Sequence, residues 1–202
     1  MARRRASGRL FVISSPSGGG KTTVVNHLQR KFPHLVRSVS VTTRVPRRGE
    51  QPGRDYHFVS PRAFEQLKRS RRLLEWAQVH GASYGTPKRP ILHALAHGRD
   101  MLLSIDVQGA HQVRRALGKR AVLVFLVPPS LEELRRRLTR RRTETAEAIR
   151  RRLTVARREL VCARWYDYRI VNDRLADTVR QVGALMAGSN RVSNRQRKGK
   201  RG

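Results

Sequence analysis

A glycine-rich turn between an apolar run and a helix-like segment constrains the fold of this chain most strongly. The turn follows Leu10–Ile13, precedes Val24–Arg30 and reads Ser14-Ser15-Pro16-Ser17-Gly18-Gly19-Gly20-Lys21-Thr22-Thr23. In a strand–turn–helix order, the backbone N–H groups of the turn and the positive end of the helix dipole face an anion. The segment therefore predicts a phosphate-binding loop.

Two side chains of the turn suit the phosphates of a nucleoside triphosphate. Lys21 can reach the β- and γ-phosphates, and Thr22 can place its hydroxyl on Mg²⁺. The usual pattern is G-x-x-x-x-G-K-[ST], and Ser15 occupies the position of its first glycine. The alternative is an ordinary glycine-rich turn. The apolar run before the turn and the helical pattern after it favour the phosphate loop.

Apolar, β-branched runs alternate with helical patterns along most of the chain. We expect strands at Leu10–Ile13, Met101–Ile105, Ala121–Val127 and Tyr168–Val171, and helices at Val24–Lys31, Gly109–Leu117, Leu131–Thr139 and Leu175–Met186. Nearly continuous apolar runs are typical of buried parallel strands. The alternation predicts an α/β fold with a doubly wound parallel sheet, whose ligands lie beyond the carboxyl ends of the strands.

Residues 37–90 interrupt this alternation. Short strands are expected at 38–42, 55–59 and 73–79, with a helix from Pro61 to about Arg69. We interpret the segment as an inserted α+β subdomain. Residues 1–8 are predicted to be a basic arm, and residues 189–202, which lack apolar periodicity, a disordered basic tail.

The composition is strongly basic, with 45 Lys and Arg against 14 Asp and Glu and a net charge of +31 in 202 residues. Polyanion binding is one explanation, and an arginine-biased solvated surface is the other. Because the excess is spread along the chain, the arginine-biased surface is favoured.

Cys162 is the only cysteine of the sequence, which excludes an intrachain disulfide and a cysteine-based zinc site. No apolar run approaches bilayer length, and the basic N-terminus is interpreted as mature protein.

From about Arg9 to Met186 the chain resembles the guanylate kinase family. Besides the phosphate loop, the resemblance rests on Ser38–Arg47, Gly53–Tyr56, Glu75–Ala77, Tyr84–Thr86, Asp106–Gly109, Arg141–Thr145 and Val171–Asp173. Each piece is weak alone, but the set in this order is highly specific. It implies a P-loop kinase domain over 9–188 that transfers the γ-phosphoryl group of ATP to GMP. Its expected parts are a core (9–36, 91–134 and 153–188), a GMP-binding insert (37–90) and a lid (135–152).

The resemblance also assigns the acceptor phosphate. In the family, residues matching Arg44, Arg47, Tyr56 and Tyr84 hold the phosphate of GMP. These residue types suit the task, because a guanidinium binds phosphate through a planar fork of donors and a tyrosine hydroxyl adds a neutral donor. The alternative for the two arginines is an ordinary surface position in an arginine-rich protein.

Recognition of guanine requires acceptors that face its N1–H and N2–H₂ donors. The resemblance gives this role to Glu75, whose alternative is an exposed strand carboxylate, and gives base contacts to the hydroxyls of Ser40 and Thr86. Ser104 stands where the family usually has the first aspartate of Asp-x-Asp-x-Gln-Gly, which helps to hold guanine. We therefore expect looser guanine recognition that depends mainly on Glu75.

The donor side and the lid complete the set that the resemblance implies. Ser15 to Thr23 bind the ATP phosphates, Asn172 contacts the donor adenine, and Thr22 and Asp106 position Mg²⁺, the latter directly or through water. Phosphoryl transfer depends on positioning and electrostatics and needs no covalent nucleophile. With Lys21 and Arg44, the catalytic set is completed by three lid arginines that clamp the phosphoryl group: Arg137, Arg141 and Arg152.

Two other functions stay open on the sequence. A related phosphate-loop kinase could act on a phosphorylated sugar, although such a substrate needs no guanine-reading segment around Glu75. A nucleic-acid-binding or scaffold protein could use the same fold, although Lys21-Thr22 is intact. For the kinase we expect a cytoplasmic location, ATP with GMP or dGMP as substrates, no membrane, a weak polyanion or RNA contact through the tail, and an undetermined oligomeric state.

Overall fold

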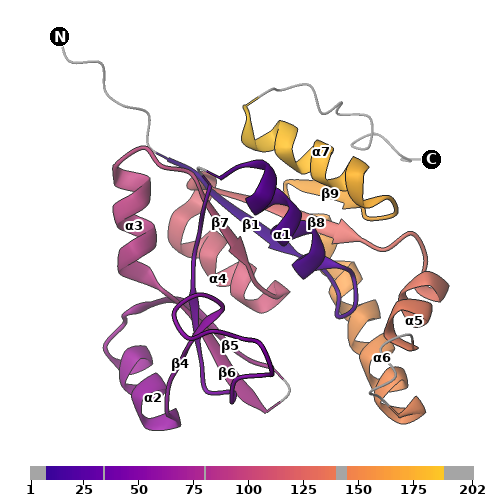
Figure 1. Ribbon diagram of the computed structural model, residues 1–202, viewed down its shortest axis with the longest axis horizontal. Helices are drawn as coiled ribbons and strands as arrows, with labels where there is room; N and C mark the ends of the chain where they lie inside the picture. The colour runs from indigo at the N-terminus through magenta and orange to yellow at the C-terminus, as the bar shows by residue number, and fades with distance from the viewer. Residues whose placement is uncertain (1–7, 34, 80, 140–144, 189–202) are drawn as a thin grey trace.

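The central sheet places the phosphate loop in the middle of the molecule. The structure, a computed structural model, describes residues 8–33, 35–79, 81–139 and 145–188. In this part of the chain, five parallel strands lie in the order β2-β7-β1-β8-β9, of which Figure 1 labels β7, β1, β8 and β9. Their bounds are β2 Val36–Arg37, β7 Met101–Ser104, β1 Leu10–Ser14, β8 Ala121–Val127 and β9 Tyr168–Val171.

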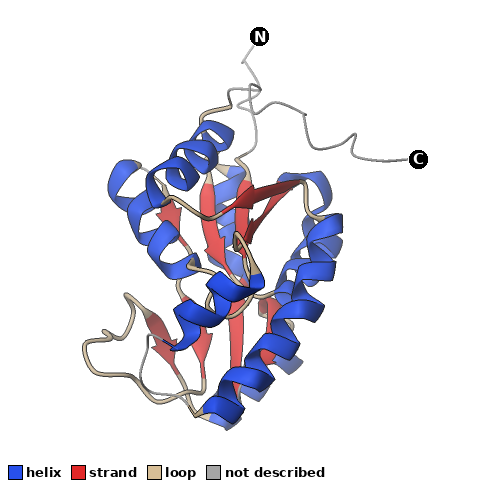
Figure 2. Ribbon diagram, turned by 90° about the vertical axis from the view of Figure 1, so that its right-hand side faces the viewer, coloured by secondary structure: helices blue, strands red, loops and turns tan. Residues whose placement is uncertain are grey.

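Helices cover both faces of this sheet, which explains why its strands are continuously apolar. Successive side chains of β1 point to opposite faces, so Leu10 and Val12 pack into one apolar cluster and Phe11 and Ile13 into another. Helices α3 and α4 contribute to the first cluster, and α1 and α7 to the second; Figure 2 shows helices on either side of the strands. The bounds are α1 Lys21–Lys31, α3 Lys88–Ala96, α4 Val107–Leu117 and α7 Leu175–Met186.

A second, smaller sheet lies within residues 40–87 in the order β4-β3-β6-β5, as far as the chain is described. Its strands are β3 Ser40–Thr42, β4 Tyr56–Phe58, β5 Leu73–Val79 and β6 Ala82–Pro87, and α2 spans Pro61–Arg69. The side-chain amide of Gln112 on α4 binds both backbone groups of Trp76, accepting its N–H at 3.1 Å and donating to its carbonyl at 2.7 Å. These two bonds fix β5 against the core.

Helices α5 (Leu131–Thr139) and α6 (Ala146–Cys162) form an antiparallel pair at the side of the core (Figure 1). Leu134, Leu138 and Ala156 are buried between them. The 3₁₀ turns η1 (Gly118–Arg120) and η2 (Ala163–Trp165) complete the described elements. Among the described helices, none is long and apolar enough to cross a membrane.

The predicted α/β fold with a parallel sheet is confirmed, and the expected strands and helices are present with small boundary shifts. Helices α1 and α4 begin three and two residues earlier than predicted, because the phosphate-loop lysine and the Asp106 cap already start them. Sequence reasoning missed β2, β6, α3 and α6. Strand β6 contains Gly85 and Pro87, which are poor strand formers, and its place is decided by pairing with β5.

A strained residue follows the C-terminal end of α2. Arg71 has φ +53°, and among the described residues other than glycine no other φ is positive. Side chains disfavour this left-handed conformation by about 1–2 kcal/mol, whereas glycine adopts it readily. We expect Arg71→Gly to raise the free energy of unfolding by about 0.5–1 kcal/mol, part of the gain being offset by the entropy of the unfolded chain.

Urea denaturation of the two proteins measures this difference. Arg72→Gly is the matched control, since Arg72 is the exposed neighbour with a negative φ. It should be no more stable than the parent. Equal effects of both substitutions would contradict the strain assigned to Arg71.

Candidate active site

A cavity of about 370 Å³ opens between the phosphate-loop end of the core sheet and the second sheet. Residues far apart in the sequence meet there, because the carboxyl ends of parallel strands share one edge of a sheet. Of the residues proposed from the sequence, the cavity is lined by Lys21, Thr22, Ser40, Arg44, Arg47, Tyr56, Glu75, Tyr84, Ser104 and Asp106.

The phosphate loop links β1 to α1 and depends on glycine. Gly18 and Gly20 have φ of +85° and +86°. A Cβ on Gly20 would lie 2.6 Å from Nδ2 of Asn172, so this position also has no room for a side chain. Helix α1 starts directly after Gly20. Its first N–H groups have no intrahelical partner, which makes this end of the helix suitable for an anion.

Lys21 is the first residue of α1, and oxygen atoms surround its ammonium group. Its Nζ donates to the carbonyl of Ile105 at 3.0 Å. Burial lowers the pKa of the Lys21 ammonium, while the carboxylates of Asp106, Glu159 and, more weakly, Glu75 act in the opposite direction. Lys21 is only partly exposed, and an ammonium surrounded by protein groups attracts a phosphate more strongly than a fully solvated lysine does.

Asn172 ties the loop to the end of β9. Its Nδ2 donates to the carbonyl of Gly19 at 2.8 Å, and its Oδ1 accepts the hydroxyl of Thr178 at 3.0 Å. The Asn172 carbonyl accepts a bond from Nη2 of Arg137 at 3.1 Å, and Nε of Arg137 binds Glu133 at 2.8 Å. Both halves of the amide are thus engaged within the protein, and the adenine contact of Asn172 stays a prediction.

The predicted acceptor-phosphate residues form one cluster. Arg44 donates from Nε to the Tyr84 hydroxyl at 3.2 Å and from Nη2 to Glu50 at 2.8 Å. Its guanidinium lies 5.5 Å from the centre of the Tyr56 ring, which meets the Tyr84 ring edge-on at 5.9 Å. The backbone N–H of Arg47 donates to the other oxygen of Glu50 at 2.8 Å. Glu50 thereby holds the segment that contains both arginines.

Glu75 is a buried carboxylate and not the exposed strand residue of the alternative interpretation. It is 4 % exposed and accepts the hydroxyl of the fully buried Thr86. A Cβ on Gly109 would lie 2.4 Å from Oε2 of Glu75, so the glycine leaves the space that this oxygen occupies. Burial raises the pKa of Glu75 to about 7, the Thr86 hydrogen bond acts against this, and Asp106 adds to it.

Thr22 and Asp106 offer oxygen ligands at the edge of the cavity. Oδ1 of Asp106 accepts the N–H of Gly109 at 2.8 Å and so caps α4. Within the described residues no three His, Cys, Asp or Glu side chains form a group that could hold a metal ion. A hydroxyl and one carboxylate fit Mg²⁺, because that ion is usually held by few protein groups together with substrate phosphates and water.

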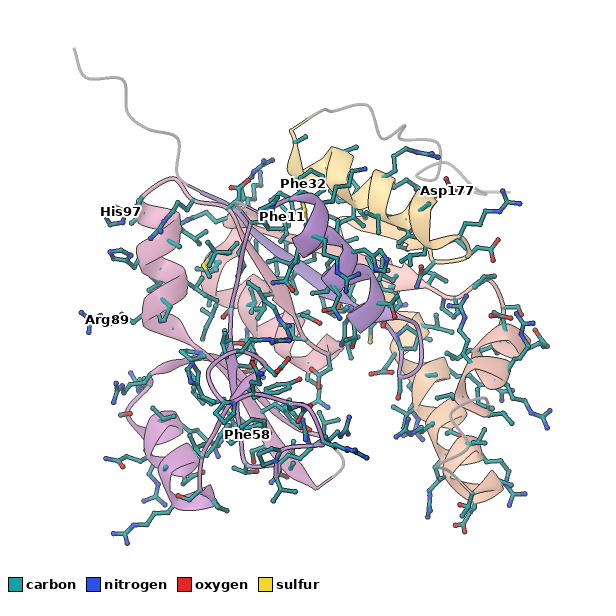
Figure 3. All side chains as sticks on the ribbon, viewed as in Figure 1. Phe11, Phe32, Phe58, Arg89, His97 and Asp177 are labelled. Atoms are coloured by element: carbon teal, nitrogen blue, oxygen red, sulfur yellow. The ribbon has the colours of Figure 1, made fainter. Side chains whose placement is uncertain are left out.

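Of the arginines predicted to form a lid, Arg137 donates to the Asn172 carbonyl, and Arg152 is half-buried on α6. Arg141 and its neighbour Arg142 lie outside the described residues, so the prediction for Arg141 stays a prediction. His93 and His97 lie on the surface of α3 with rings 4.2 Å apart, and Figure 3 shows His97 on the outer side of that helix.

Sequence reasoning missed several residues of the site. Arg37, Glu50, Asp55 and Asn26 line the cavity, and Glu159 hydrogen-bonds to the phosphate loop. The acids could have been noticed, because only 14 acids stand among 45 basic residues and each is therefore conspicuous. Arg37 could not have been recognised from the sequence, because it is one arginine among many. Only the pairing of β2 with β7 places it at the site.

Comparison with known proteins agrees with this geometry. The model of the family described as guanylate kinase matches residues 7–188. The chain belongs to the guanylate kinase family. It is 49 % identical over 183 residues to a guanylate kinase of Dechloromonas aromatica, covering 91 % of this chain and 90 % of that protein. It is 50 % identical over 179 residues to one of Thermobifida fusca, covering 89 % and 91 %.

A solved guanylate kinase from Anaplasma phagocytophilum superimposes with a TM-score of 0.76 at 35 % identity, covering 91 % of this chain and 86 % of that one. A shikimate kinase from Acinetobacter baumannii, at 16 % identity and a TM-score of 0.51, shares the fold alone. This guanylate kinase family member is accordingly an ATP:GMP phosphotransferase on a P-loop α/β fold.

The buried carboxylate of Glu75 makes a prediction about stability. Its pKa is about 7 in the folded protein and 4.5 ordinarily, so the folded state binds more protons between these values and stability falls as pH rises through 7. We expect Glu75→Gln to be more stable than the parent by up to about 3 kcal/mol at pH 8, with little difference at pH 5.

Thermal unfolding at both pH values measures the effect. Glu65→Gln on α2, whose parent side chain is 44 % exposed, is the control and should show no comparable difference. A Glu75→Gln protein that gains as much at pH 5 as at pH 8 would contradict the charge-burial explanation.

Proposed function

We propose that the cavity binds the phosphate of GMP at Arg44 and the terminal phosphates of ATP at Lys21, so that the two anionic groups meet between them. The main support is that both cationic groups line one cavity, although Lys21 follows a strand of the core sheet and Arg44 follows a strand of the second sheet. An in-line transfer of a phosphoryl group requires such opposed binding of donor and acceptor.

On the donor side, the loop from Ser15 to Thr23 would hold the ATP phosphates through backbone N–H groups and the Lys21 ammonium. Thr22 and Asp106 would hold Mg²⁺, Asp106 either directly or through water. When bound, Mg²⁺ neutralises negative charge on the phosphates. Asn172 would contact the donor adenine while its amide keeps Gly19 in place.

On the acceptor side, Arg44, Arg47, Tyr56 and Tyr84 would bind the GMP phosphate. The Arg44–Tyr84 bond and the Arg44–Glu50 ion pair orient the guanidinium before the nucleotide arrives, which reduces the entropy lost on binding. The attacking phosphate oxygen is already ionised near neutral pH. No protein group therefore needs to remove a proton.

For the base, Glu75 would accept the N1–H and N2–H₂ donors of guanine. The Thr86 hydroxyl fixes one oxygen of the carboxylate, and Gly109 leaves room for the other. Guanine binding favours the ionised carboxylate, because a protonated acid accepts fewer hydrogen bonds. Ser40 would contact the base through its hydroxyl, and Ser104 supplies a neutral group where the family has an aspartate.

The lid arginines Arg137, Arg141 and Arg152 would neutralise charge on the transferring phosphoryl group and help to exclude water. The division into core, insert 37–90 and lid 135–152, the cytoplasmic location, the use of dGMP and the polyanion contact of the tail stay predictions.

A coupled assay of ADP release with GMP, AMP, dGMP, UMP and CMP tests the reaction. The parent should prefer guanine nucleotides, and Lys21→Met should lower kcat by roughly 10²–10³-fold, because it removes a cation that faces the transferring group. A Lys21→Met enzyme with the parental rate would refute the donor-site assignment.

Base selectivity tests the acceptor-site assignment separately. Ser104→Asp should raise the ratio of kcat/KM for GMP over AMP by about tenfold, since a carboxylate forms stronger hydrogen bonds than a hydroxyl. Ser104→Ala is the matched control and should lower the ratio or leave it unchanged. An unchanged ratio in Ser104→Asp would place Ser104 outside the base contact.

A further inference from the structure

Glu159 is a partly buried acid that the proposed transfer does not use. It lies on α6, and its Oε2 accepts the backbone N–H of Ser17 in the phosphate loop at 3.3 Å. In the described part of the chain it binds this main-chain group and forms no ion pair with any of the many arginines. A merely solvated acid in such a basic protein would not be expected to bind the backbone of the phosphate loop.

The charge of Glu159 also faces the cavity groups around Lys21. Burial raises the pKa of Glu159, whereas its bond to Ser17 and the charge of Lys21 act against this rise. The groups that face the carboxylate electrostatically are therefore Lys21, which is attractive, and Asp106, which is repulsive. Since a carboxylate is a stronger acceptor than a neutral group, the bond to Ser17 is strengthened by this charge.

Helix α6 connects this contact to the lid. The helix spans Ala146–Cys162 without a break, and Arg152 precedes Glu159 by seven residues, which is two helical turns and about 10 Å on the same face. Ala156, between them, packs against Leu134 and Leu138 of α5. A movement of the lid end of α6 is therefore transmitted to Glu159 by a stiff element.

The phosphate loop needs such contacts, because three successive glycines provide no side chains to hold it. Its described contacts include the bond from Gly19 N–H to the Pro16 carbonyl (2.8 Å), the Asn172 bond to Gly19 and the Glu159 bond to Ser17. Ordering backbone is entropically unfavourable by about 1–2 kcal/mol per residue, and most so for glycine. Each anchor therefore favours ATP binding by ordering the loop beforehand.

We propose that Glu159 is a positioning residue that ties the lid helix α6 to the phosphate loop and so sets the affinity of the loop for the phosphates of ATP. The inference rests on the donor site proposed above. It assigns no contact between Glu159 and either nucleotide. Its effect should consequently fall on ATP and not on GMP.

Steady-state kinetics with each substrate varied in turn tests the proposal on the full chain. Glu159→Ala should raise KM for ATP about tenfold, the loss expected for a hydrogen bond to a charged group, and leave KM for GMP within about twofold. Glu159→Gln keeps an acceptor for Ser17 and should recover most of the loss. Glu147→Ala removes an exposed acid of the same helix, which pairs with Arg151, and should match the parent.

Three results would overturn the proposal: an unchanged KM for ATP in Glu159→Ala, an equal rise for both substrates, or a Glu159→Gln enzyme as impaired as Glu159→Ala. If Glu159→Ala does not fold, the Glu159→Gln enzyme decides. A rise of about threefold in KM for ATP alone supports the proposal. The proposal is refuted if KM for ATP does not rise more than KM for GMP. An inactive parent enzyme would instead overturn the proposed function itself, so the two failures are distinguishable.

Discussion

The placement of one helix end at the carboxyl end of a fully buried strand is the constraint on which the rest of this structure depends. All five residues of β1 are 0 % exposed, with neighbours on both edges and helices on both faces, so the strand cannot shift without disturbing two apolar clusters. The phosphate loop and the first turn of α1 are held in place as well, because they directly follow β1. The second sheet and the helix pair α5–α6 are arranged around that fixed point.

Function and stability conflict at the acceptor end of the cavity. A chain with a large excess of cations buries the carboxylate of Glu75, beside Asp106 and within the field of Lys21. Burial of an acid is unfavourable for folding, yet guanine recognition requires an acceptor that water does not screen. In the proposed site this cost is offset, because the same desolvation that raises the pKa of Glu75 would strengthen its hydrogen bonds to guanine.

Local patterns predicted the core, and long-range pairing decided the rest. The apolar runs and the Gly-Lys-Thr turn were sufficient for β1, β7, β8 and β9 and for the phosphate loop, because both faces of a parallel sheet are buried. The resemblance supplied many of the residues that line the cavity, but the contacts among them could not be predicted. Glu50 and Glu159 are examples, since their roles depend on where a loop and a helix meet the site. Helix α6 was missed because its apolar stripe of Ile149, Leu153, Ala156 and Leu160 is interspersed with arginines.

Helix α4 joins the two ends of the reaction in one element. Asp106 caps it, Gly109 accommodates the Glu75 carboxylate, and Gln112 holds the backbone beside that carboxylate. Sliding the second sheet along the core to admit a different base would break the Gln112 bonds and would also disturb Asp106, the aspartate that we propose to lie near the phosphates. A change of acceptor base in this fold is therefore easier by exchange of individual side chains than by movement of the second sheet.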